Sequence, residues 1–255
     1  MTDSVMRRPV PLDAMHWRCS GHFRVTRRRI VLLGDSITVG CRETGVTAQT
    51  TYPSYLKRQL GRAGLDVELI VSALHGVYMG YAVRRFERMV GRHNPNYVMI
   101  MLGANDAVPA GRNSRTSPED FQTALESLVR LCTLTKATAI IASPPPRSDA
   151  RSSFLLKSYA ETARSIADQS ELPFIDLFTT LNEERFLNKL LPDCQHPSPA
   201  ANRIIADLVL DCLRAVPELG GNVSSSSVAL TESQTTETTQ SLSKACPQAR
   251  PTGSP

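Results

Sequence analysis

Short apolar segments of strand length alternate with helix-like segments through the central part of this chain. Several of the apolar runs are nearly continuous, which is typical of strands covered on both faces in a parallel sheet. Neighbouring parallel strands need crossover connections, and right-handed crossovers place helices on both faces of the sheet. The alternation therefore predicts an α/β fold, a doubly wound domain of three layers, α/β/α. The predicted strands are 29–33, 66–72, 96–102, 137–142 and 173–177.

The segments between these strands carry helix start signals and apolar stripes. Pro53, Pro118 and Pro199 suit a first helical turn, where a missing N–H costs nothing, and Ser117 and Ser198 precede two of them as N-caps. Apolar residues that recur three or four positions apart predict the buried helix faces. These residues are Met79, Val83, Phe86 and Val90; Phe121, Leu125, Leu128 and Cys132; and Ile204, Ile205, Leu208, Val209 and Cys212.

Composition divides the 255-residue chain into three parts. Residues 1–29 hold seven arginines and two aspartates, a net charge of +5 that equals the charge of the whole chain. We predict a disordered basic arm over 1–28, a folded domain over 29–216, and a disordered tail over the serine- and threonine-rich residues 217–255. Because the body of the chain is neutral, we expect no nucleic-acid partner.

The sequence also predicts the cellular location of the protein and the redox state of its cysteines. No apolar run is long enough to cross a bilayer, so we expect no integral membrane segment. The absence of a secretory signal and of CxxC spacing among six cysteines predicts reduced thiols, an intracellular and cytoplasmic protein, and no structural zinc. The basic arm resembles a mitochondrial presequence weakly. Buried side chains are favoured for Cys41 and Cys194, with a regulatory disulfide between them as the alternative.

Polar residues follow the predicted strands at the edge where such a sheet binds its ligands. Ser36 follows the first strand, Gly76 the second and Asn105 the third, while Asp193 and His196 precede the last helix. Ser36 supplies a hydroxyl, His196 a base that titrates near neutral pH, and Asp193 an acceptor that orients the imidazole. The backbone N–H groups of Ser36 and Gly76 and the amide of Asn105 can donate to an oxyanion. This set predicts acyl transfer by a serine.

Four short blocks carry a family resemblance: Gly34-Asp35-Ser36 with Gly40, the glycine after the second strand, "GAND" and "DCQHP". In order and spacing they resemble the GDSL esterase/lipases of the SGNH hydrolase superfamily, over roughly residues 29–214. The likeness is greatest to small single-domain esterases of the arylesterase and lysophospholipase kind. It implies a flavodoxin-like five-stranded parallel sheet, no metal or cofactor, and cleavage of an acyl ester, a lysophospholipid or a small aryl or alkyl ester through an acyl-enzyme.

One block departs from the family pattern, and several functions share the same residues. The segment "VSALHGVYMGYA" offers both Gly76 and Gly80 as the oxyanion glycine. Its distance from "GAND" favours Gly76, with Gly80 as the alternative. The same site would serve a thioesterase, a carbohydrate O-acetyl esterase or an acyltransferase. A noncatalytic binding module on this fold is a second alternative.

Other polar residues near the blocks receive structural interpretations. We interpret Asp35 and Asp106 as acceptors that shape their loops. His75, beside Gly76, is the one further histidine expected to face the crevice. The polar stretch 107–120 is long enough for a flap over the site, although solvated loop arginines are the favoured interpretation of Arg112 and Arg115.

Overall fold

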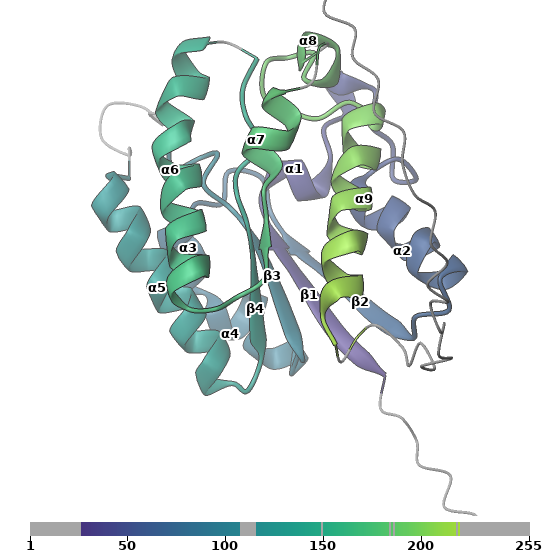
Figure 1. Cartoon of the computed structure of the whole chain (residues 1–255), viewed down its shortest axis with the longest axis vertical. Helices are drawn as coiled ribbons and strands as arrows, with labels where there is room; N and C mark the ends of the chain where they lie inside the picture. Colours follow the sequence, from purple (N-terminus) through teal and green to yellow (C-terminus); the bar gives the residue numbers. More distant parts are fainter. Residues whose placement is uncertain are drawn as a thin grey trace, which may run out of the picture. The chain divides into compact units, whose positions relative to one another are not determined.

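A five-stranded parallel sheet, in the order β2-β1-β3-β4-β5, forms the centre of the protein (Figure 1). The computed structural model describes residues 27–107, 116–148, 150–183, 185, 187–217 and 219. Most of the predicted basic arm and tail, and the part of the predicted flap that holds Arg112 and Arg115, lie outside the described residues. The strands are β1 (Arg28–Gly34), β2 (Val67–Ala73), β3 (Tyr97–Met101), β4 (Thr138–Ala142) and β5 (Phe174–Ile175).

Helices cover both faces of this sheet, as the alternating pattern predicts. Figure 1 shows α3, α5 and α6 on one side of the sheet and α2 and α9 on the other. Within the described part of the chain, no helix is both long and apolar enough to span a membrane. The helices are α1 (Ser36–Val39), η2 (Arg42–Thr44), α2 (Tyr52–Arg62), α3 (Met79–Arg84), α4 (Phe86–Met89), η3 (Gly91–His93), α5 (Pro118–Leu134), α6 (Ala150–Gln169), α7 (Leu177–Asn182), α8 (Leu187–Leu190) and α9 (Pro199–Ala215).

Alternate residues of β1 belong to two separate hydrophobic cores, one on each face of the sheet. Ile30 and Leu32 pack in the core that includes α2 and α9, whereas Val31 and Leu33 pack in the core that includes α3, α5 and α6. All four side chains are at most 1% exposed. Burial of each such side chain contributes about 1.5–3 kcal/mol. β1 is therefore held firmly from both sides, and it fixes the position of the residues that follow it.

The first turns of α5 and α9 begin as predicted. Pro118 and Pro199 are the first residues of these helices, and Ser117 and Ser198 are their N-caps. Each serine hydroxyl oxygen accepts the backbone N–H of the third helical residue, which satisfies a donor that has no partner within the helix. Because its cap fixes where α9 starts, the loop just before it, residues 191–198, is anchored at that end.

Two elements differ from the sequence prediction. β5 has two residues instead of five, because the Asp176 side chain accepts the backbone N–H of Thr179 at 3.0 Å and starts α7. A local capping interaction thus ends the strand, which an apolar pattern does not reveal. The apolar stripe from Met79 to Val90 is divided between α3 and α4 and ends at the C-cap of α4, because Arg85 (φ −113°, ψ 16°) leaves the helical conformation.

The carboxyl ends of the strands lie in register. Gly34 of β1 pairs with Ala73 of β2 and with Met101 of β3. Met101 pairs in turn with Ala142 of β4, which pairs with Ile175 of β5. The loops that follow the strands therefore leave the sheet at one common edge, which is where this architecture binds its ligands.

Candidate active site

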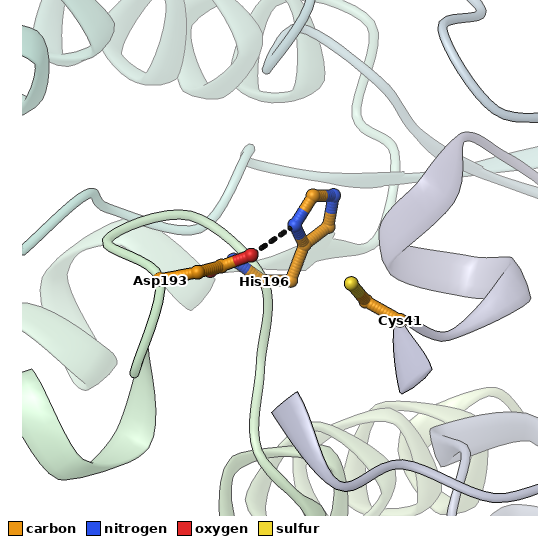
Figure 2. A group of neighbouring side chains, drawn as sticks. All are labelled: Cys41, Asp193 and His196. Carbon is orange, nitrogen blue, oxygen red and sulfur yellow. Dashed lines mark hydrogen bonds and ion pairs between the residues drawn. The ribbon is translucent and has the colours of Figure 1, made fainter. Parts of the chain in front are cut away.

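Ser36, His196 and Asp193 form a chain of hydrogen bonds at this edge of the sheet. Ser36 Oγ lies 2.9 Å from His196 Nε2, and His196 Nδ1 lies 2.7 Å from Asp193 Oδ2; Figure 2 shows the second of these interactions. A carboxylate can only accept, so Nδ1 of a neutral imidazole donates to Asp193 and Nε2 is left to accept from the Ser36 hydroxyl. The structure thus brings together the predicted hydroxyl, base and orienting carboxylate.

The Asp193 carboxylate is held by the loop that carries His196. Its Oδ1 accepts the backbone N–H of His196 at 2.6 Å and that of Gln195 at 3.0 Å. Partial burial raises the pKa of Asp193, but the hydrogen bonds from the His196 backbone, the His196 ring and Gln195 outweigh it and bring the pKa below its ordinary value. Asp193 is therefore ionised at neutral pH and accepts the hydrogen bond from His196 Nδ1.

Ser36 is positioned by the sharp turn between β1 and α1. A Cβ atom at Gly34 would lie 2.0 Å from Thr38 Oγ1, so only glycine allows α1 to fold back so closely on the end of β1. Asp35 then caps α1, because its Oδ1 accepts the backbone N–H of Ile37 at 2.9 Å. The Ser36 hydroxyl is thus presented from a rigid strand end, on a residue that is only 6% exposed.

The amide of Asn105 joins three of the loops at this edge. Its Nδ2 donates to the carbonyl oxygen of Val77 at 2.9 Å and to Asp35 Oδ2 at 3.2 Å. Asp35 is 1% exposed, and this burial raises its pKa to about 6 despite the hydrogen bond from Ile37. The amide is therefore fixed next to the residue that precedes Ser36.

Gly76 and Gly80 occupy different kinds of backbone. Gly76 lies in the turn after β2, which the Val77 N–H closes on the carbonyl of Leu74 at 3.4 Å. Its φ of +74° is in the left-handed region that favours glycine. Gly80 is the second residue of α3. Gly76 directly precedes Val77, the residue to which Asn105 is bonded.

Asp106 has a structural role that sequence reasoning describes only as loop shaping. Its side chain is fully buried, and both carboxylate oxygens lie 3.1 Å from the backbone nitrogen of Met79, the first residue of α3. Burial raises the pKa of Asp106 to about 6. The loop after β3 is thereby tied to the start of α3. No spacing rule identifies this pair, because the contact spans two loops.

A cavity of about 440 Å³ lies beside α1, and its lining includes Val39, Cys41, Glu43, Val46 and His75. His75 is the one histidine among the residues that line this cavity. The remaining lining residues follow α1 and surround η2. This segment carries no recognisable motif, so its place in the cavity wall could not be predicted from the sequence.

The prediction that Cys41 and Cys194 are buried is wrong. Cys194 is exposed and Cys41 is partly exposed, whereas Cys132 is buried as expected. Cys194 has a positive φ of +68° and lies in a loop in which Pro192 and Asp193 are exposed as well. All four cysteines in the described part of the chain are free thiols, so the alternative of a disulfide between Cys41 and Cys194 is not realised.

With this geometry in place, the comparison with known families is decisive: residues 32–204, more than half of the chain, match the GDSL-like lipase/acylhydrolase family. The chain belongs to that family. It is a serine hydrolase that cleaves carboxylic esters, and its three-layer sheet is the SGNH hydrolase fold, as the four sequence blocks imply.

Individual relatives of this GDSL-family chain are esterases. It is 25% identical over 187 residues to an arylesterase from Vibrio mimicus. The matched region covers 71% of this chain and 86% of the relative. It is also similar to the crystal structure of a lipase/acylhydrolase from Enterococcus faecalis, with a TM-score of 0.64, 25% identity, and coverage of 72% and 94%. The acetylxylan esterase Axe2 from Geobacillus stearothermophilus shares the fold, with a TM-score of 0.64, 21% identity, and coverage of 72% and 93%.

Proposed function

We propose that this GDSL-family esterase hydrolyses small carboxylic esters with Ser36 as the nucleophile, His196 as the general base and acid, and Asp193 as the residue that orients His196. The backbone N–H groups of Ser36 and Gly76 and the amide of Asn105 bind the oxyanion. The observation that carries the proposal is the continuous hydrogen-bond chain from Ser36 Oγ through His196 to Asp193.

In the first half of the reaction, Ser36 Oγ attacks the ester carbonyl carbon while His196 Nε2 takes the hydroxyl proton. The carbonyl oxygen becomes an oxyanion. When the tetrahedral intermediate collapses, the bond to the leaving alcohol oxygen breaks, and His196 returns the proton to that oxygen. The ionised Asp193 stabilises the imidazolium that exists between these two transfers.

In the second half, a water molecule takes the place of the alcohol. His196 removes a proton from the water, the resulting hydroxide attacks the acyl carbon, and the ester bond to Ser36 breaks. The proton then returns to Ser36 Oγ, and the carboxylic acid leaves. Because His196, Asp193 and the oxyanion donors act in both halves, a substitution at any of them should slow acylation and deacylation alike.

For the Asn105 amide to bind the oxyanion, one of its two existing hydrogen bonds has to change. Both hydrogens of the Asn105 amide already have acceptors, Val77 O and Asp35 Oδ2. The longer bond, to Asp35 at 3.2 Å, is the easier one to share with a developing oxyanion. Gly76 is favoured over Gly80 as the oxyanion glycine because it lies in an open turn next to Val77, where a glycine leaves room for substrate.

We take the cavity beside α1, whose lining begins at Val39 three residues after Ser36, as the substrate pocket, and its lining favours a small substrate. Its wall combines the apolar Val39 and Val46 with the charged Arg42 and Glu43. A long acyl chain needs continuous apolar surface, because each buried CH₂ group contributes about 0.8 kcal/mol and charged neighbours must lose water. A short acyl group or a small aryl alcohol suits this lining better. The likeness to an arylesterase supports the same substrate class.

The location and domain limits stay predictions of the sequence. We propose an intracellular, cytoplasmic location, as the sequence predicts. We propose that residues 29–216 form the catalytic domain, flanked by an arm over 1–28 and a tail over 217–255.

Kinetics of the Ser36→Ala variant test the proposed nucleophile. The variant should fold normally and lose turnover of p-nitrophenyl acetate, whereas Ser127→Ala, which changes a partly exposed serine on α5, should keep it. Rates of the unmodified chain on p-nitrophenyl esters from acetate to palmitate should fall as the acyl chain lengthens. Near-normal activity of Ser36→Ala would overturn the mechanism, and absence of turnover on every ester would favour the noncatalytic alternative.

A further inference from the structure

Cys41, Asp193 and His196 bring together three side chains that can bind a metal ion. One donor atom from each, the sulfur, a carboxylate oxygen and a ring nitrogen, lies within 4.8 Å of the other two. In the view of Figure 2, Asp193 and Cys41 lie on either side of His196. Cys41 comes from the segment between α1 and η2, and the other two come from the loop before α9.

We propose that these three residues form an inhibitory zinc site that overlaps the base of the esterase. The binding of zinc stands on the geometry alone, whereas the inhibition rests on the proposed function. Nothing in the catalytic cycle requires this ion. Zinc instead would compete with the reaction for His196.

The donor set matches the preferences of zinc. Thiolate, imidazole and carboxylate are its three usual protein ligands, at about 2.0–2.3 Å. Such bonds place neighbouring donors roughly 3.5 Å apart in a tetrahedron, so the present spacing of up to 4.8 Å has to shorten by about 1 Å. Rotation of the partly exposed Cys41 side chain provides this movement. A fourth position stays open for water.

Binding requires two existing hydrogen bonds to change. The Cys41 thiol donates to Glu43 Oε2 at 3.0 Å, and this proton leaves when the thiolate bonds to zinc. On His196, a zinc ion that is also bound to Asp193 has to take the place of the Nδ1 proton, because Nε2 lies on the other side of the ring and faces Ser36. A neutral imidazole bound through Nδ1 carries its proton on Nε2, so it has no lone pair left to accept the Ser36 proton.

The choice of metal follows from the sulfur. Magnesium and calcium prefer sets of oxygen ligands, and a thiolate does not suit them. Inhibition should therefore be specific for zinc and similar thiophilic ions. Removal of the ion by a chelator should restore activity, because no covalent bond within the protein has changed.

The test compares the full chain with Cys41→Ser, and with Cys212→Ser as a matched control on α9, all under reducing conditions. Cobalt(II) serves as a spectroscopic probe, because a cobalt–thiolate bond produces charge-transfer absorption in the near ultraviolet. The unmodified chain and Cys212→Ser should show this absorption, and Cys41→Ser should lack it. The zinc concentration that halves p-nitrophenyl acetate turnover, relative to each protein's own rate, should rise at least ~10-fold in Cys41→Ser.

The two readouts separate the zinc site from the proposed function. If the chain has no esterase activity, the cobalt spectrum still decides whether the site exists. An active enzyme that shows no cobalt–thiolate absorption would overturn the site. Equal zinc sensitivity in the unmodified chain and Cys41→Ser would overturn it as well, and magnesium at the same concentrations should have no effect.

Discussion

Ser36 Oγ and His196 Nε2 lie 2.9 Å apart although 160 residues separate them in the chain. Ser36 is carried by the turn after β1, and His196 by the loop before α9. Leu32 of β1 and Ile205 of α9 belong to the same hydrophobic core. Tertiary packing therefore sets the distance between nucleophile and base, and polar substitutions at the site should change the rate much more than the stability.

Replacement of Asn105 by alanine removes the proposed side-chain donor to the oxyanion. We expect kcat for p-nitrophenyl acetate to fall by about 10²–10³-fold with little change in KM, because the interaction is strongest in the transition state. Steady-state kinetics give both constants, and urea unfolding shows whether the variant is still folded at the assay temperature. A raised KM with unchanged kcat would mean that Asn105 binds the substrate and the transition state equally well, which would contradict its role as an oxyanion donor.

Asp35→Asn tests whether Asp35 positions Asn105. The new amide keeps an oxygen for the Ile37 N–H but can turn its own NH₂ group toward the Asn105 amide, which then loses an acceptor. We expect kcat to fall by less than it does in Asn105→Ala. The double variant should be no slower than Asn105→Ala alone, because both changes act on one group. Losses that multiply in the double variant would show that Asp35 acts by another route.

Asp193→Asn tests the orientation of His196. The asparagine keeps an oxygen for the two backbone N–H groups of its loop, but an NH₂ group placed toward Nδ1 favours the wrong imidazole tautomer. We expect kcat to fall by up to about 10⁴-fold. The matched control is Asp211→Asn, on the exposed surface of α9, which should keep full activity. Equal rates for the two variants would exclude an orienting role for Asp193.

Asp106 should make stability depend on pH in a defined window. Burial raises its pKa in the folded state from 3.8 to about 6, so the folded chain binds more protons than the unfolded chain between these values. Its contribution to the free energy of unfolding is complete below about pH 4 and is lost as the pH rises through 6. Asp106→Asn does not titrate and keeps an oxygen for Met79.

Urea unfolding at pH 4 to 7 checks this effect. The free energy of unfolding of Asp106→Asn, measured relative to the unmodified chain, should rise between pH 4 and 6 and then level off. Asp35 also has a raised pKa, mainly because of its own burial and to a smaller extent because of the Asp106 charge, so most of its effect cancels in the difference. A difference that does not vary with pH would contradict the role of the buried Asp106 carboxyl.

The alternation of strands and helices along the chain could be predicted from the sequence. Apolar runs locate all five strands, and proline with serine marks where α5 and α9 begin. The end of β5 could not be predicted, because the side chain of Asp176 starts α7 within the apolar run. Such local competition between a cap and a strand leaves no trace in hydrophobic periodicity.

The candidate site divides in the same way. Ser36, Asn105 and His196 stand at strand or loop ends where the order of the blocks identifies them. The contact between Asn105 and Asp35 and the approach of Cys41 to His196 depend on how loops far apart in sequence meet in space. The positions of those loops follow from the packing of the whole sheet, so no short motif contains them.

The central claim is that Ser36 is an activated nucleophile, and a fluorophosphonate tests it most directly, because only such a serine reacts readily. The full chain is incubated with the reagent and digested, and the adduct is located by mass spectrometry. We predict a single adduct on Ser36, formed much more slowly in His196→Ala. A folded, unmodified chain that carries no adduct on Ser36, or that is labelled at another serine, would contradict the account.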